Sequence, residues 1–136
     1  MLTMNYSSIC FHIIGLDTKI RFAGIASLDG KILAAEYRQD IIIQKPLLTL
    51  QESELSMMQS LMRMSIRRTL EGKLGRTVYA TAVYEKVKRA TIPLFNEEEK
   101  NDSYLMVSFE REANHEAIIN EKILPFLEKI GKGLAN

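Results

Sequence analysis

Apolar residues recur every three or four positions over residues 5–17, a period that predicts a short helix. The pattern then changes, because residues 21–28 and 31–38 are rich in types that suit β-strands. Asp29-Gly30 joins these two runs. Asp-Gly in this position is the strongest short-range signal for a β-hairpin, since both central residues of a two-residue turn need a positive φ. We therefore expect a helix followed by a hairpin.

A second, longer helical pattern begins after Pro46. Thr49 and Glu52 have the spacing of a capping box, in which each side chain accepts a hydrogen bond from the other residue's backbone amide. Acidic residues begin this helix and basic residues end it, which suits the helix dipole, and Gly72 and Gly75 provide the stop. Its apolar residues form two adjoining stripes, Met57/Leu61/Met64 and Met58/Met62/Ile66.

Three further strands are expected at residues 77–85, 87–94 and 104–110, with a tight turn near Glu85-Lys86. Asn114 can cap a final helix, whose apolar residues are Ile118, Ile119, Ile123, Leu127 and Ile130. This helix should be kinked or split by Pro125, which removes an amide donor and crowds the preceding turn.

The predicted order is α-β-β-α-β-β-β-α. Strands in hairpin-linked groups with one long helix between them predict an α+β fold, with a five-stranded, mostly antiparallel sheet and flanking helices.

Composition narrows the class of protein. The chain has 136 residues, of which 46% are hydrophobic and 26% charged, as in a globular domain. We expect one domain over residues 1–136, large enough to bury roughly two-thirds of its unfolded surface. No apolar stretch is long enough to span a bilayer, and no Lys or Arg precedes Lys19, unlike a secretory signal. A single cysteine excludes an internal disulfide framework, so we expect a cytoplasmic protein.

Residues that could perform catalysis or bind a metal are few. Cys10, His12 and His115 are the only soft ligands or nucleophile–base partners in the sequence. Cys10 and His12 are two positions apart and face different sides of a helix. Cys-x-x-Cys, His-Glu-x-x-His and the glycine-rich nucleotide loops are absent. We therefore expect no enzyme activity, no metal and no cofactor, with Cys10 packed in the interior and His115 exposed.

Two elements could form an interface between copies of the chain. Residues 77–83 carry no charge and have small side chains on one face. At a sheet edge such a strand leaves unpaired amides and carbonyls that invite another strand, although a central strand already paired within the monomer remains an alternative. The long helix is rich in methionine, which adapts well to partner surfaces, or it packs deeply on its own sheet. The candidate interface residues are Met57, Met58, Leu61, Met62, Val78, Ala80 and Ala82.

Basic residues form two clusters, although the formal net charge is only +1. The candidate partner-contact residues are Arg67, Arg68, Lys86, Lys88 and Arg89. Such clusters could contact nucleic acid, with Tyr79 or Tyr84 available for stacking on bases. Nearby Glu71 and Glu85 dilute them, however, and Lys88 and Arg89 point to opposite faces of a strand. A solvated charged surface is therefore favoured over a nucleic-acid site.

The hairpin at Leu28-Asp29-Gly30-Lys31, the long helix after it and the order of elements resemble the Roadblock/dynein-light-chain family, within the profilin-like group. The resemblance covers nearly the whole chain. It implies a non-enzymatic protein that homodimerises or heterodimerises, with third strands edge to edge and long helices side by side. It also implies a surface that binds small Ras-like GTPases. A PAS- or GAF-like sensor, with a ligand between the sheet and the long helix, remains the alternative.

Three short segments are also similar to an uncharacterised family of small archaeal proteins, a resemblance that brings no known activity. They are Ile20-Arg21-Phe22-Ala23, Gly30-Lys31-Ile32 and Tyr84-Glu85-Lys86-Val87-Lys88-Arg89.

Overall fold

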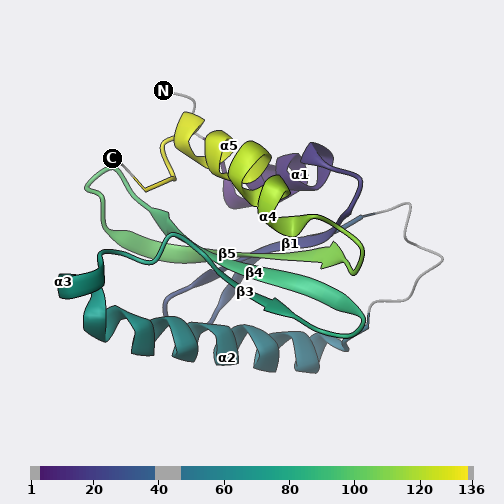
Figure 1. The fold of residues 1–136 in the computed structure, drawn as a ribbon, viewed down its shortest axis with the longest axis horizontal. Coiled ribbons are helices and arrows are strands. Elements are labelled where there is room, and N and C mark those ends of the chain that lie inside the picture. The colour runs from purple at the N-terminus through teal and green to yellow at the C-terminus, as the bar shows by residue number, and fades with distance from the viewer. Residues whose placement is uncertain (1–3, 39–46, 135–136) are drawn as a thin grey trace.

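A computed structural model describes residues 4–38 and 47–134. Its elements follow the predicted order α-β-β-α-β-β-β-α, with short additional turns after the second helix and within the last one (Figure 1). The elements are α1 (Tyr6–Leu16), β1 (Ile20–Ser27), β2 (Ile32–Tyr37), α2 (Leu50–Arg67), a 3-10 turn (Arg68–Leu70), α3 (Glu71–Leu74), β3 (Ala80–Val83), β4 (Val87–Phe95), β5 (Asn101–Glu110), α4 (His115–Ile118), a π-helical turn (Ile119–Ile123) and α5 (Leu124–Lys129).

The five strands form one sheet in the order β2-β1-β5-β4-β3, and each pair of neighbours is antiparallel. Helices α1, α4 and α5 cover one face, and α2 covers the other (Figure 1). The larger core lies under α1 and α5 and includes Ile13, Ile25 and Phe109. A smaller core under α2 includes Met57 and Tyr104. The predicted α+β fold class is confirmed.

The β1–β2 hairpin is also confirmed, but with a different turn. The amide of Gly30 donates to the carbonyl of Ser27 at 3.0 Å, and the amide of Ser27 donates to the carbonyl of Lys31 at 2.8 Å. Three residues therefore form the loop, a common arrangement when the last one is a glycine. Gly30 has a φ of 90°, whereas Asp29 does not have a positive φ. The predicted two-residue turn, with positive φ at both central positions, is wrong.

The long helix begins at the predicted capping box. The amide of Glu52 donates to Oγ1 of Thr49 at 3.1 Å, and the amide of Thr49 donates to Oε1 of Glu52 at 2.9 Å. The chain leaves the helical conformation at Gly75, whose φ is 84°. Gly72 lies inside α3 instead, so Gly75 alone provides the predicted stop.

β3 is shorter than the strand predicted over residues 77–85. The amide of Tyr84 donates to the carbonyl of Val87 at 2.8 Å and closes the β3–β4 hairpin. In an antiparallel ladder every second pair of opposite residues is hydrogen-bonded. Before Tyr84, these pairs are Ala82 with Arg89 and Ala80 with Thr91. The next such position on β4 falls at Pro93, which has no amide proton to donate. The ladder therefore ends at Ala80.

The last helix is divided as predicted. The Asn114 side chain accepts a hydrogen bond from the amide of Ala117 at 3.2 Å, which caps α4. Pro125 lies in the first turn of α5, directly after the π-helical turn. Because proline cannot donate to a carbonyl of the preceding turn, the wider turn accommodates the missing bond.

Candidate interaction surface

β3 lies at an edge of the sheet, and within the described residues its one neighbouring strand is β4. Its four residues, Ala-Thr-Ala-Val, carry no charge. Val83 is 55% exposed, and Val78, just before the strand, is 44% exposed. Ala80 is half-buried and Ala82 is exposed. The outer side of β3 thus offers unpaired backbone groups beside small or aliphatic side chains, which is the condition for pairing with another strand.

The predicted interface residues on α2 separate into two groups. Met57 is 3% exposed and Leu61 is 6% exposed, because both pack with Met64 against the sheet. These residues therefore serve the protein's own smaller core. Met58 and Met62 are 43% and 60% exposed, and remain available for contact with a partner.

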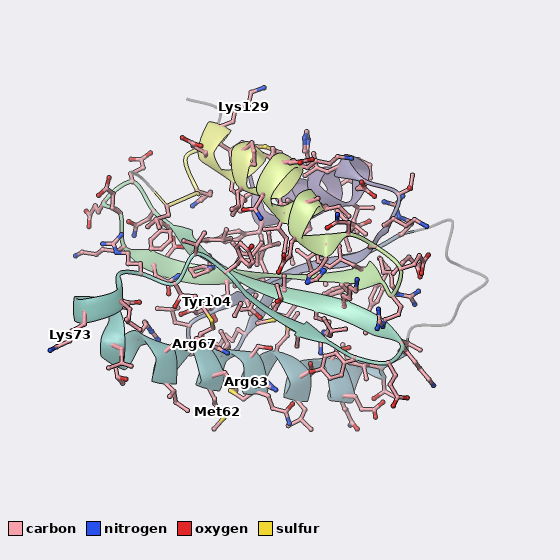
Figure 2. All side chains as sticks on the ribbon, viewed as in Figure 1. Met62, Arg63, Arg67, Lys73, Tyr104 and Lys129 are labelled. Atoms are coloured by element: carbon pink, nitrogen blue, oxygen red, sulfur yellow. The ribbon has the colours of Figure 1, made fainter. Side chains whose placement is uncertain are left out.

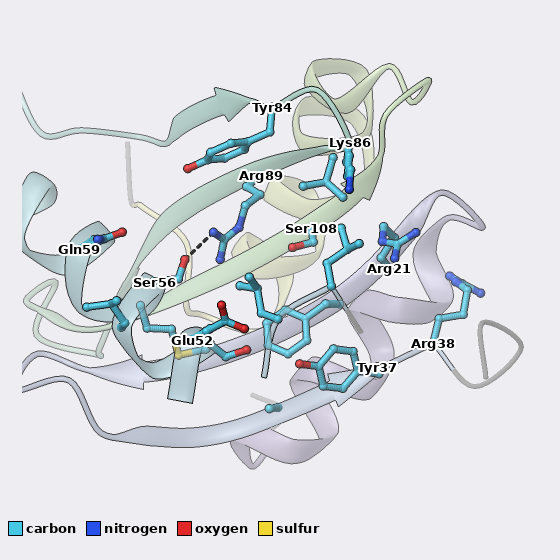
Figure 3. Close-up of a pocket in the computed structure, with 18 of the residues that line it drawn as sticks. Arg21, Tyr37, Arg38, Glu52, Ser56, Gln59, Tyr84, Lys86, Arg89 and Ser108 are labelled. Carbon is cyan, nitrogen blue, oxygen red and sulfur yellow. Dashed lines mark hydrogen bonds between the residues drawn. The ribbon is translucent and has the colours of Figure 1, made fainter. Parts of the chain in front are cut away.

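Two contacts determine which side of α2 faces β3. Arg89 on β4 donates a hydrogen bond from Nη1 to Oγ of Ser56, so this side of the helix faces β4 and β3 (Figure 3). Met58 packs instead against the β1–β2 turn, where a Cβ added to Gly30 would lie 2.5 Å from the Met58 Cε. The side of α2 nearest β3 therefore carries small polar residues, Ser53, Ser56 and Ser60, rather than methionine.

The structure does not bring the two basic clusters together. Arg89 is held at Ser56, whereas Arg67 lies about 16 Å further along α2. Lys88 donates from Nζ to the carbonyl of Ala113 at 2.7 Å, on the opposite face of the sheet. The predicted opposition of Lys88 and Arg89 is confirmed, and no continuous basic path for a nucleic acid follows from these positions.

A pocket of about 1110 Å³ opens between the first half of α2 and the sheet (Figure 3). The sequence placed a ligand between the sheet and the long helix only in the PAS- or GAF-like alternative. It did not identify the lining, which comes from segments far apart in the chain and includes Arg21, Tyr37, Glu52, Tyr84, Lys86 and Arg89. Phe22 and Tyr37 pack in it with ring centroids 4.7 Å apart. Arg21 forms an ion pair with Glu110 at 3.1 Å.

The three soft ligands predicted from sequence lie apart. Cys10 is fully buried, and burial, reinforced by repulsion from the Glu36 carboxylate, raises its thiol pKa to about 12. His12 stacks on Phe126 with ring centroids 4.1 Å apart. His115 is half-buried with its edge against Phe109, so the expectation that it is exposed is wrong. Within the described residues, no three His, Cys, Asp or Glu side chains are grouped as metal ligands.

An antiparallel five-stranded sheet between one long helix and a pair of helices, with β3 at an open edge, is the Roadblock-type fold. No protein-family model and no curated protein matches the sequence. In the part of the chain that the structure describes, no helix has the length and apolar character needed to cross a bilayer.

Solved structures match over nearly the whole chain at low sequence identity. A Roadblock/LC7 domain from Streptomyces avermitilis has a TM-score of 0.67 and 11% identity, covering 93% of this chain and 95% of that one. The gliding protein mglB from Thermus thermophilus has a TM-score of 0.67 and 12% identity, covering 96% and 93%. A PobR inducer-binding domain from Acinetobacter, in complex with 3-hydroxybenzoic acid, has a TM-score of 0.53 and 12% identity, covering 92% of each chain. These similarities show the fold, and the two Roadblock-type structures have higher TM-scores than the inducer-binding domain.

Proposed function

We propose that this protein is a non-enzymatic, homodimeric interaction module that regulates or scaffolds a small Ras-like GTPase or a related signalling partner. The observation that carries the proposal is the open, uncharged edge at β3 next to the serine-bearing side of α2. The Roadblock-type fold supports it, since the resemblance implies self-association through the third strand and the long helix.

In the proposed dimer, a two-fold axis perpendicular to the sheet places β3 against the partner's β3. The hydrogen-bonded pairs between β3 and β4 fall at Ala80 and Ala82. The amides and carbonyls of Thr81 and Val83 therefore point toward the open edge, where two antiparallel copies can bond to each other. Such a contact is self-complementary, as a two-fold interface must be.

The same axis brings the two α2 helices side by side and antiparallel. Ser56 and Ser60 lie on the side that faces the axis, and their small side chains permit a close approach of the helices. In this arrangement Val78, Ala80 and Ala82 remain interface residues, as predicted from sequence. Met58 and Met62 lie outside the contact between helices, and the serine side takes their place.

We propose that the partner binds at the end of the pocket between α2 and the sheet, next to the β3–β4 turn. Lys86 is exposed there, and Arg89 is positioned by Ser56 beside Tyr84 (Figure 3). Together they offer cations and an aromatic side chain to an acidic partner surface. Arg67 and Arg68, at the far end of α2, belong to a different surface.

Light scattering after size exclusion, over a range of protein concentrations, tests the dimer first. We expect a mass of twice 15.5 kDa, and a monomer at all concentrations would overturn the proposal. The partner is tested by capture from native lysate loaded with GTP or GDP. We expect a small GTPase that is retained by the native protein and lost with Lys86→Glu, which changes an exposed turn residue and leaves the Arg89–Ser56 contact in place.

A further inference from the structure

Large apolar side chains on the protein surface are concentrated on α2 and α3. Among the described residues, seven of the sixteen exposed large apolar side chains lie between Leu50 and Leu74, so this surface differs from the rest. Four of them follow one another at intervals of four positions: Met62, Ile66, Leu70 and Leu74 are 60%, 69%, 56% and 79% exposed. Residues four apart share one side of a helix, which places Met62 and Ile66 together on α2, while Leu70 ends the 3-10 turn and Leu74 ends α3. We call these four residues the outer ridge.

Cations accompany the outer ridge. Residues 62–74 contain Arg63, Arg67, Arg68 and Lys73, all exposed, and one acidic residue, Glu71. The ridge segment therefore has a net charge of +3, whereas the whole chain has +1. Figure 2 shows Met62 directed away from the sheet and Arg63 on the same turn of α2, with Lys73 projecting from α3.

The shape of this surface is that of a ridge. Neither the pocket under the first half of α2 nor the smaller hollow beside α4 is lined by any residue from 62 to 74. The buried side of α2 ends at Met64, and the side that faces β3 carries Ser56 and Ser60, so the ridge lies outside both the core and the proposed dimer contact. A convex row of apolar side chains next to long basic ones resembles the face of a helix that lies in a membrane interface.

We infer that the outer ridge adsorbs to the surface of an anionic phospholipid membrane. Met62, Ile66 and Leu70 enter the boundary between headgroups and acyl chains, while Arg63 and Lys73 extend their aliphatic stems beside the ridge and contact lipid phosphates. An anionic bilayer provides the negative charge that complements these cations, and a convex surface can bind it without a complementary groove on the partner. A second copy docked ridge to ridge would instead bring two segments of net positive charge together.

This inference is independent of the proposed GTPase and dimer function. It is tested by co-sedimentation of the protein with large unilamellar vesicles, either of phosphatidylcholine alone or of phosphatidylcholine mixed with phosphatidylglycerol. We expect binding to the anionic vesicles that weakens as salt is raised. Absence of binding to anionic vesicles, or equal binding to both kinds, would overturn the inference.

Matched variants locate the binding surface. Each cation near an anionic membrane contributes about fivefold to affinity, so Arg63→Gln/Lys73→Gln should weaken vesicle binding roughly 25-fold. The control is Arg111→Gln/Lys129→Gln, which removes one exposed cation from the β5–α4 turn and one from α5, the helix on the opposite face of the sheet, and should leave binding close to native. Equal losses in the two pairs would refute the assignment to the ridge.

The apolar part of the ridge has its own variant. Ile66→Ser/Leu70→Ser retains all charges and should also lose vesicle binding. Circular dichroism would confirm that α2 is intact in each variant. Retention of native binding by this pair would contradict insertion of the ridge. Thr81→Pro, which is directed at the β3 edge, separates the two proposals, because it should leave adsorption of the ridge in place.

Discussion

Arg89 on β4 and Ser56 on α2 are joined by a hydrogen bond from Nη1 to Oγ, although 33 residues separate them in sequence. On the other side of the same helix, Met58 packs against Gly30 in the β1–β2 turn. These two contacts set the rotation of α2 on the sheet. The helix consequently presents a buried side to the core, a serine side to the β3 edge and an apolar side to solvent.

The open edge of β3 leads to the first prediction. The amide of Thr81 points away from β4, because the hydrogen-bonded pairs fall at Ala80 and Ala82. Thr81→Pro should therefore preserve the ladder with β4 while removing a donor from the outer side. Thr81 of both protomers lies in the two-fold contact, so the substitution removes two hydrogen bonds, each worth about 1 kcal/mol. We expect the dimer dissociation constant to rise roughly tenfold or more, as measured by analytical ultracentrifugation.

Thr81→Val is the matched control, because it retains the amide and a β-branched side chain. It should leave the dissociation constant near the native value. A Thr81→Pro protein that folds and dimerises like the native one would show that β3 does not form the interface.

Local signals in the sequence were sufficient for most of the fold. The capping box of Thr49 and Glu52 depends on residues three apart, and the split at Pro125 depends on one proline. The start of β3 was mispredicted because it depends on Pro93, which lies on the neighbouring strand just beyond the last pair, Ala80 and Thr91. Sequence periodicity cannot reveal such a pairing.

The candidate surfaces were predicted less well for the same reason. Periodicity placed Met57 and Met58 in two adjoining stripes, but could not say which stripe is buried. That depends on how α2 is rotated on the sheet, which the long-range Arg89–Ser56 contact helps to set. The residues that line the pocket also escaped prediction, since Tyr37 and Tyr84 come from separate hairpins.

A glycine in the β1–β2 turn provides a stability prediction. Gly30 has a φ of 90°, and an added Cβ would lie 2.5 Å from Cε of Met58. Gly30→Ala should lower the free energy of unfolding by about 1–2 kcal/mol, because alanine is strained in the left-handed backbone conformation and its Cβ would displace the Met58 side chain. Urea denaturation measures the change.

Gly15→Ala is the comparison for that substitution. Gly15 lies in α1, and an added Cβ there meets nothing within 4 Å. Alanine should raise the free energy of unfolding by about 0.5–1 kcal/mol, because it favours the helix. In Gly30→Ala/Met58→Ala the clash is removed and the backbone strain stays, so the loss should be only partly recovered. Equal effects of alanine at Gly15 and Gly30 would contradict the account of the turn.

The single cysteine reports on opening of the larger core. Burial, together with the nearby Glu36 carboxylate, raises the pKa of Cys10 from 9.0 to about 12, which leaves roughly a thousandfold less thiolate at pH 8. The native protein should therefore react with a disulfide reagent only as fast as it opens, whereas the protein in urea should react at once. The reaction is measured by the absorbance of the released reagent. Immediate labelling of the native protein would contradict the burial of Cys10 between α1 and the sheet.

His115 gives stability a pH dependence whose sign is fixed by its surroundings. Burial, and then the positive charge of Lys88, lower its pKa below 6.5, with Glu116 opposing them. Its Nε2 is buried and has no hydrogen-bond partner among the described residues. The unfolded chain therefore binds a proton near pH 6.5 that the folded protein does not yet bind. The free energy of unfolding should be fully retained above this pH and should fall as the pH is lowered from 7 to 5.

The variant His115→Gln isolates this group, because glutamine does not titrate. Urea denaturation at several pH values between 7 and 5 should show a shallower slope for the variant than for the native protein. This window lies above the ordinary pKa values of carboxyl groups, so Asp17 and Glu112, whose pKa values are lowered further in the fold, add little to the slope there. If both proteins lose stability equally over this range, the buried imidazole is not its source.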